Sequence, residues 1–346
     1  MRMQPISDHP DERMRLHCGA ERSSPRGREF VFFANFAADA TYEPFGHVYS
    51  YRPDRDVPWM YAEIESFIHR ATAGRLLPDG PDYVFLLSID GEFWALSEPG
   101  QSFGDTIPGA GTWSSDGLGD THSIAVINGV LYVGGASGQI YRRAGGAAGQ
   151  WEDIGTNLTG GDGMIIGTCV DTAGNLYALS RRPAAKTVRG RPNDAVLYVQ
   201  EFDRSWQSIL TIANENVSAA PVPAIDEGVL VAIGREGVFA VRRDGSSNTY
   251  ASLAYPTELG SLALYGNSLY AASGLLHVQQ DGHLVRQTWP SAIAPSTLGR
   301  SIGGNIGSTH LSIGNDAVLS VGRSDDHTDI ARFRPGAISA IEFPIR

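Results

Sequence analysis

The sequence contains little cysteine and almost no lysine. Two cysteines, Cys18 and Cys169, cannot form a scaffold held together by several disulfides in a chain of 346 residues. We expect both to be small, inert apolar side chains. Lys186 is the only lysine among the 27 basic residues, and it lies in a locally basic stretch of the chain. Catalysis by a buried lysine amine is therefore not expected.

Long hydrophobic runs are also missing. No apolar stretch approaches the roughly 18 residues that a membrane-spanning helix needs. Residues 1 to 11 lack the apolar region of a secretory signal. We therefore expect a cytoplasmic protein that makes no contact with a membrane.

Basic side chains are scarcer than acidic ones, 27 against 38, and the formal net charge is −11. Proteins that bind nucleic acids neutralise phosphates with clustered Lys and Arg. The charge balance therefore argues against nucleic acid as a partner. It favours a basic partner, because opposite charges steer association.

Glycine, in contrast, is abundant, with 41 residues that separate short runs rich in Val, Ile, Leu and Tyr. The clearest unit contains four predicted strands, each bounded by Gly, Asn, Asp or Ser. These strands cover residues 121–126, 128–135, 138–143 and 151–155. Related units begin near residues 29, 82, 165, 222, 261 and 309. A four-strand unit that recurs roughly every 35–55 residues is typical of a β-propeller, because such sheets bury their two apolar faces against each other in a ring.

The pattern predicts an all-β, seven-bladed β-propeller with four antiparallel strands per blade, with six or eight blades as alternatives. We expect one propeller domain over residues 29–346 and a mostly flexible N-terminal segment over residues 1–28. Within that segment, residues 13–19 alternate enough to form a strand. Ring closure removes free sheet edges, so we expect a monomer.

One unit resembles known propeller blades. The run from Gly129 to Gly155, with its Gly-x-Leu-Tyr-Val, Tyr-Arg-Arg and Trp-x-x-Ile-Gly segments, is similar to blades of bacterial tectonin, BNR and WD40/YVTN-like propellers. The resemblance implies the fold. The similarity to tectonin blades in particular implies a carbohydrate-binding, lectin-like surface at Arg142, Arg143 and Trp151. No Trp-Asp dipeptide closes a blade, and the Tyr-Arg-Arg…Trp run occurs once, so the resemblance does not assign an activity.

Two histidines are the candidate catalytic residues. His122 and His310 each follow a threonine at the start of a predicted inner strand, which would place both at the mouth of the central channel. With Asp120, and with Asp116 and Asp162 on neighbouring loops, they could ligate a metal or act as a general-base pair. The competing interpretation is that both histidines form hydrogen bonds at strand ends.

Two stretches are candidate binding surfaces. Residues 181–191, which include Arg181, Arg182 and Arg189, form a basic connection longer than a hairpin needs. It is either an exposed loop or an electrostatic contact for an acidic ligand or partner. Aromatic residues of the first unit are either interface anchors or packing residues between blades; those selected as anchors are Tyr49, Tyr51 and Trp59.

The chain carries no GxSxG, HExxH, P-loop or CxxC motif, so we expect no cofactor and no bound metal. The leading hypothesis is a non-catalytic protein-binding propeller, of the bacterial immunity type that neutralises a basic toxin or effector. The first alternative is a lyase or hydrolase that acts on a glycan or small metabolite at the channel mouth. The second alternative is the lectin-like propeller.

Overall fold

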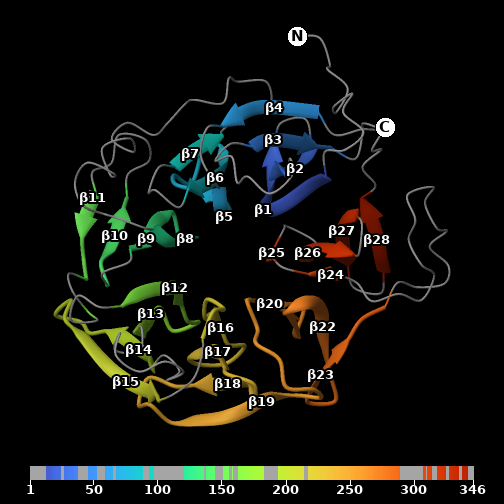
Figure 1. The fold of residues 1–346 in the computed structure, drawn as a ribbon. Coiled ribbons are helices and arrows are strands. Elements are labelled where there is room, and N and C mark those ends of the chain that lie inside the picture. Colours follow the sequence, from blue (N-terminus) through green and yellow to red (C-terminus); the bar gives the residue numbers. More distant parts are fainter. Residues whose placement is uncertain are drawn as a thin grey trace.

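The computed structural model shows the strands as sheets arranged in a ring (Figure 1). It describes residues 13–24, 27–37, 46–52, 59–64, 68–88, 93–96, 121–135, 138–144, 151–155, 158, 163–182, 194–213, 217–288, 307–308, 310–313, 318–324, 327–334 and 337–341. All regular elements in these residues are strands, so the all-β prediction is confirmed. Among the described residues, no helix is long and apolar enough to cross a membrane.

The strands follow the chain around the ring in groups of hydrogen-bonded neighbours. The first sheet contains β1 (Arg13–Ser24), β2 (Gly27–Ala37), β3 (Gly46–Tyr51) and β4 (Trp59–Ile64), and the second contains β5 (Ile68–Arg75), β6 (Asp82–Ser88) and β7 (Phe93–Leu96). The third contains β8 (Thr121–Ile127), β9 (Val130–Gly135), β10 (Ile140–Arg143) and β11 (Trp151–Asp153). The fourth contains β12 (Met164–Val170), β13 (Leu176–Arg182), β14 (Asp194–Gln200) and β15 (Trp206–Ile212). The second half contains β16 (Val222–Pro223), β17 (Val229–Ile233), β18 (Gly237–Val241) and β19 (Ser247–Leu253); β20 (Ser261–Tyr265), β21 (Ser268–Ala272), β22 (Gly274–Gln280) and β23 (His283–Arg286); β24 (Gly307–Ser308); and β25 (His310–Ile313), β26 (Val318–Ser324), β27 (His327–Arg334) and β28 (Ala337–Ile341).

Tight turns join consecutive antiparallel strands, as the glycine pattern predicts. Between β8 and β9, Asn128 and Gly129 have φ angles of 49° and 78°. Positive φ at both central positions defines the hairpin turn whose twist matches that of the flanking strands. Asn and Gly adopt this conformation more easily than other residues, so the local sequence determines the turn.

The hydrophobic core lies between neighbouring sheets. Phe85 and Leu87 of β6 pack in one cluster with Leu131 and Val133 of β9, and all four side chains are fully buried. Equivalent clusters join other neighbouring sheets, for example β12–β15 with β17 and β18. Each sheet therefore buries its apolar faces against its neighbours, as a propeller requires.

The N-terminal strand is longer than the sequence predicted. Strand β1 extends to Ser24, beyond the expected end at residue 19, and pairs with β2 along its length. Its central residues Cys18 and Ala20 are fully buried, and burial of this apolar face keeps the segment in the sheet. The sheet of β1–β4 also contacts the sheet of β25–β28, so the first and last sheets meet.

The number of blades stays a prediction. Most four-strand groups form separate sheets, but a short parallel pairing of β19 with β23 joins β16–β19 and β20–β23 into one nine-stranded sheet that also includes β24. The sheet of β5–β7 has three strands among the described residues, and residues 97–120, which follow it, lie outside them.

Candidate functional site

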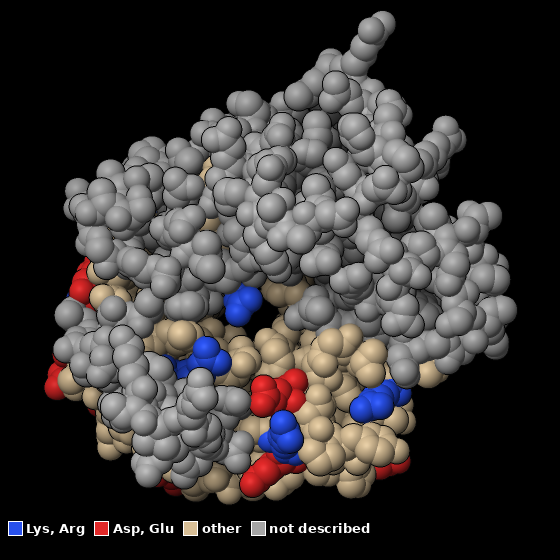
Figure 2. Space-filling model, viewed as in Figure 1, with Lys and Arg blue, Asp and Glu red and all other residues tan. Residues whose placement is uncertain are grey.

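The innermost strands line a central channel. Its cavity has a volume of about 350 Å³ and is bordered by β5, β8, β12, β20 and β25 and by residues 218–222 around β16. This volume is within the range of small-molecule sites, about 300–1,000 Å³. Figure 2 shows a hollow near the centre of the ring, with arginine or lysine atoms on its wall.

His310 lies on β25 and contributes to the channel wall. Burial, and then the positive charge of Arg70, lower the pKa of its imidazole to about 4, against an opposing hydrogen bond to the backbone of Gly19. The ring is therefore neutral at pH 7. Its Nε2 atom is buried and has no hydrogen-bond partner among the described residues.

One arginine lies in the channel wall, and a second contacts a residue of that wall. Arg70 is on β5 in the channel wall, and burial lowers the pKa of its guanidinium. Arg181 is near the end of β13, and its Nη1 donates a hydrogen bond of 3.5 Å to Oγ of Ser218, which also lines the channel. The backbone of Arg182 follows in the strand, but its side chain lies outside the described residues, as does all of Arg189.

The two candidate histidines lie on strands whose residues border the channel, and the placement of His122 at the channel mouth stays a prediction. His122 and His310 are both on innermost strands, β8 and β25. The side chain of His122 and all of Asp116, Asp120 and Asp162 lie outside the described residues. A catalytic or metal-binding role for this set stays a prediction. In the part of the chain that the structure describes, no group of three or more His, Cys, Asp or Glu side chains could hold a metal ion.

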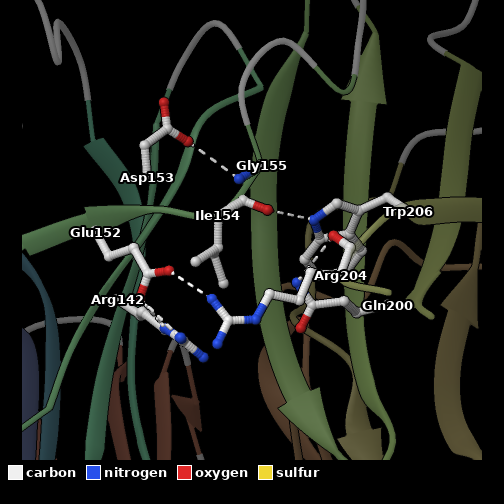
Figure 3. Close-up of polar contacts among 8 residues, drawn as sticks. All are labelled: Arg142, Glu152, Asp153, Ile154, Gly155, Gln200, Arg204 and Trp206. Carbon is white, nitrogen blue, oxygen red and sulfur yellow. Dashed lines mark hydrogen bonds and ion pairs between the residues drawn. The ribbon is translucent and has the colours of Figure 1, made fainter. Parts of the chain in front are cut away.

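The predicted carbohydrate surface is largely occupied by internal contacts. Arg143 and Trp151 face each other across β10 and β11, and the guanidinium lies 5.5 Å from the centre of the indole ring. Arg143 is 1% exposed, which corrects its assignment to a ligand-binding surface. Arg142 forms an ion pair of 2.7 Å with Glu152, which also pairs with Arg204 of the neighbouring sheet (Figure 3).

Tyr49 is a core residue and not a surface anchor. Its exposed fraction is 1%, and its ring stacks on Phe32 with the ring centres 5.4 Å apart. The alternative interpretation, that these aromatics pack the blade, therefore holds for Tyr49. The side chains of Tyr51 and Trp59 lie outside the described residues.

A second surface was missed by the sequence reasoning. The turns after the first and third strands of successive sheets lie at the same end of the ring, because neighbouring turns bond to each other. Thr172 donates to the backbone carbonyl of Asp226, and Arg243 donates to Asn175 at 3.0 Å and pairs with Glu201. We call this surface the turn face; it comprises residues 76–81, 128–129, 171–175, 201–205, 224–228, 242–246, 266–267 and 281–282, together with Ile313 at the end of β25.

The turn face combines exposed apolar side chains with acidic ones. Four of the five large hydrophobic residues that stand out as exposed in the described chain lie on it: Leu77 at 50%, Phe202 at 103%, Ile225 at 44% and Ile313 at 49%. The fifth, Tyr255, lies in the connection that leaves the opposite end of β19. Seven carboxylates that are not buried and three arginines share the turn face: Asp79, Glu201, Asp203, Asp226, Glu227, Asp244 and Asp281, with Arg204, Arg242 and Arg243. Asp171 also lies in one of its turns but is buried.

The sequence does contain a signal for this surface. Each of the turns 76–80, 201–205 and 224–228 holds an apolar residue within two positions of Asp or Glu, where polar turn residues would suffice. Showing that these turns share one face requires the pairing of the strands, which turn composition does not reveal.

Comparisons with known proteins show the fold. The chain is similar to the WD40 β-propeller domain of Doa1, with a TM-score of 0.58 and 10% identity over 94% of each chain. It is also similar to the computationally designed Ika8 protein, with a TM-score of 0.50 and 12% identity over 96% of this chain and 100% of that chain. No protein-family model and no curated protein matches the sequence. The protein therefore has a β-propeller fold, while the resemblance to tectonin and BNR blades and a bacterial origin stay predictions.

Proposed function

We propose that this chain is a non-catalytic, protein-binding propeller whose turn face docks a basic protein partner. One observation carries the proposal: four exposed apolar side chains share the turn face with an excess of carboxylates. Single exposed hydrophobic residues are ordinary, but their collection on one face, surrounded by charge, is typical of an interaction surface.

Phe202 is the main proposed anchor. It lies at the tip of the turn between β14 and β15, is fully exposed, and is followed by Asp203, whose carboxylate accepts a 2.9 Å hydrogen bond from the backbone N–H of Ser205. This bond fixes the turn, so the ring is presented on a rigid support. An aromatic side chain held in this way loses little conformational entropy when a partner covers it.

The charge of the turn face indicates the class of partner. The turn face has more carboxylates than arginines, in agreement with the net charge of −11 for the whole chain. A basic protein would be steered to it, with association rates roughly 10–10³-fold above those of a neutral pair. Within this class we propose the immunity type, which occludes a basic toxin or effector.

The immunity-type form is tested with the purified product of the adjacent gene. We expect a complex on size-exclusion chromatography at micromolar concentration, with affinity that falls as salt is raised. The absence of a complex would contradict the immunity-type role.

The docking surface is tested with variants of a complex once formed. A Phe202→Ser/Ile225→Ser double variant should weaken binding by at least about tenfold, because it removes the main anchor and a second exposed apolar side chain of the turn face. Tyr255→Ser, an exposed aromatic residue away from the turn face, is the matched control and should bind as the wild type does. Equal binding by all three proteins would show that the turn face is not the docking surface.

A further inference from the structure

The central channel changes chemically along its length. The innermost strands begin at the channel mouth and end at the turn face, so the order of residues along each strand gives their depth. Toward the mouth, the polar residues that border the cavity are Arg70, Ser123, Ser218, Ser261 and His310. Toward the turn face, the bordering residues are mainly apolar: Ala73, Ala125, Val126, Val222 and Ile313. The end of the channel nearest the turn face is therefore its apolar end.

Ile313 joins the cavity to the turn face. It lies at the end of β25, borders the cavity and is 49% exposed. Leu77 and Ile225, which are also exposed, lie in the turns that follow the innermost strands β5 and β16. Such turns join the first and second strands of a sheet, whereas the turn of Phe202 joins the third and fourth strands, farther from the channel. Exposed apolar side chains thus lie near this end of the channel.

The same inner turns are acidic. Their described residues are 76–81, 128–129, 171–175, 224–228 and 266–267, which include no Lys or Arg but carry Asp79, Asp226 and Glu227 on the surface. Arg75, at the end of β5, is paired with Asp82 at 2.7 Å. Arg242, from an outer turn, borders the hollow that Asp226 and Glu227 line, so that hollow has two carboxylates and one arginine. Cationic side chains of a partner would be attracted to this rim.

The cavity inside the rim suits an apolar side chain. None of the described residues that line it is Asp or Glu, so a Lys or Arg side chain that entered would lose water without gaining a carboxylate. An apolar side chain would instead bury its surface against residues such as Val126 and Val222, which is favourable. The cavity volume of about 350 Å³ is suited to the tip of a loop.

We propose that the turn-face end of the channel receives the tip of a loop of the partner protein. One apolar side chain of that loop enters the cavity past Ile313, and Lys or Arg residues beside it pair with Asp79, Asp226 and Glu227. This inference rests on the proposed function, because it specifies how a basic partner docks on the turn face. It defines the partner by a sequence feature, a large apolar residue flanked by basic residues in a turn.

The test uses the full chain and a phage-displayed library of disulfide-closed heptapeptides, which present their side chains on a turn. We expect selection to enrich peptides that carry a large apolar residue flanked by Lys or Arg. A synthetic copy of an enriched peptide should bind with a Kd of about 100 μM or tighter by isothermal titration calorimetry. Added salt should weaken this binding. Absence of enrichment, or enrichment of peptides without basic residues, would overturn the proposal.

Variants locate the peptide. Ile313→Ser should weaken its binding by at least about tenfold, because Ile313 borders the cavity. Leu77→Ser is the matched control, since Leu77 is 50% exposed against 49% for Ile313 and does not border the cavity; it should change binding by no more than about twofold. Equal binding by these two variants would overturn the placement in the channel.

A second variant fills the cavity and leaves the turns unchanged. Ala125 borders the cavity in the middle of β8, so Ala125→Phe narrows the channel and should also weaken peptide binding by at least about tenfold. Unchanged binding by a folded Ala125→Phe would show that the peptide stays outside the cavity and would overturn the proposal. If its melting curve shows that Ala125→Phe does not fold, Ile313→Ser decides alone.

Failure of this inference is distinguishable from failure of the proposed function. The product of the adjacent gene could form a complex that is weakened by Phe202→Ser/Ile225→Ser but not by Ile313→Ser. The partner would then dock on the turn face without using the channel, and only this inference would fail. If the peptides behave as expected and the product of the adjacent gene forms no complex, the immunity-type role fails alone.

Discussion

Arg22 and Glu29 form a fully buried ion pair across β1 and β2. They are direct cross-strand partners, and Nη2 of the arginine lies 2.6 Å from Oε2 of the glutamate. Glu29 also accepts a hydrogen bond from Ser50 on β3, so its carboxylate links three strands. The pair lies in the sheet that contacts the last sheet of the ring.

Replacing Glu29 with Gln should therefore strongly destabilise the protein. The substitution leaves the Arg22 charge buried without its carboxylate, and breaking such a pair costs about 3–5 kcal/mol. Urea unfolding at pH 7 measures the loss. Glu152→Gln is the matched control, because its ion pairs are partly exposed and each contributes at most about 1 kcal/mol. Equal losses in the two variants would contradict this account.

Trp206 forms a hydrogen bond that links two neighbouring sheets. Its indole Nε1 donates a 2.5 Å hydrogen bond to the carbonyl oxygen of Ile154, which follows β11 (Figure 3). Trp206→Phe keeps an aromatic ring and removes the donor, so we expect a loss of about 1 kcal/mol in the free energy of unfolding. Amide hydrogen exchange should also become faster around Ile154. Unchanged exchange there would show that the bond does not hold the sheets together.

Two glycines allow the energetic cost of a left-handed backbone to be measured apart from the cost of a steric clash. Gly174 and Gly228 have similar positive φ angles, 88° and 85°, but a Cβ on Gly228 would lie 2.1 Å from the carbonyl oxygen of Val241, whereas one on Gly174 meets no atom within 4 Å. Gly174→Ala should cost about 1–2 kcal/mol, the usual effect of a left-handed conformation. Gly228→Ala should cost clearly more, because β18 must shift. Thermal unfolding of both variants tests the difference.

The two thiols should be unreactive in the folded protein. Cys18 and Cys169 are free and buried, as the sequence analysis expected, and burial raises the pKa of Cys18 to about 12 and also raises that of Cys169. Little thiolate therefore forms at pH 8. A disulfide reagent should titrate no thiol in the native state and both in denaturant. Rapid reaction of one equivalent without denaturant would contradict the structure.

His310 should make stability fall with acid. Its folded pKa is about 4, below the value of 6.5 for a free histidine, because of burial and the charge of Arg70. Between these values the unfolded chain binds more protons, so the free energy of unfolding decreases as pH falls from about 6.5 to 4. His277, whose pKa burial also lowers, acts in the same direction. Urea unfolding should show a smaller pH slope in His310→Gln, and an identical slope would exclude this contribution.

Local structure and the general fold were predictable from the sequence. Short runs of β-branched and aromatic residues between Gly and Asn turns, such as the turn at Asn128 and Gly129, dictate strands and hairpins because the required dihedrals suit few residues. Recurrence of the unit then indicated a ring of sheets. The positions of His122 and His310 on innermost strands followed from the same repeat.

Side-chain environment was not predictable in the same way. Arg143 and Tyr49 look like surface residues by type, yet both are 1% exposed, because an indole and a phenylalanine ring cover them from neighbouring strands. The full extent of β1 was also missed, since β1 packs not only against its neighbour β2 but also against β5, β25 and β26, which are distant in the sequence.

The sequence by itself therefore determined the strands, their turns and the propeller fold, because these depend on local dihedral preferences and on a repeated apolar pattern. Tertiary structure alone decided which residues meet at the channel mouth and which turns share a face. Arg70, Ser218 and His310 are separated by more than ninety positions, and ring closure brings them to one cavity. Charge and hydrogen bonding there depend on distances in space, which a linear pattern does not contain.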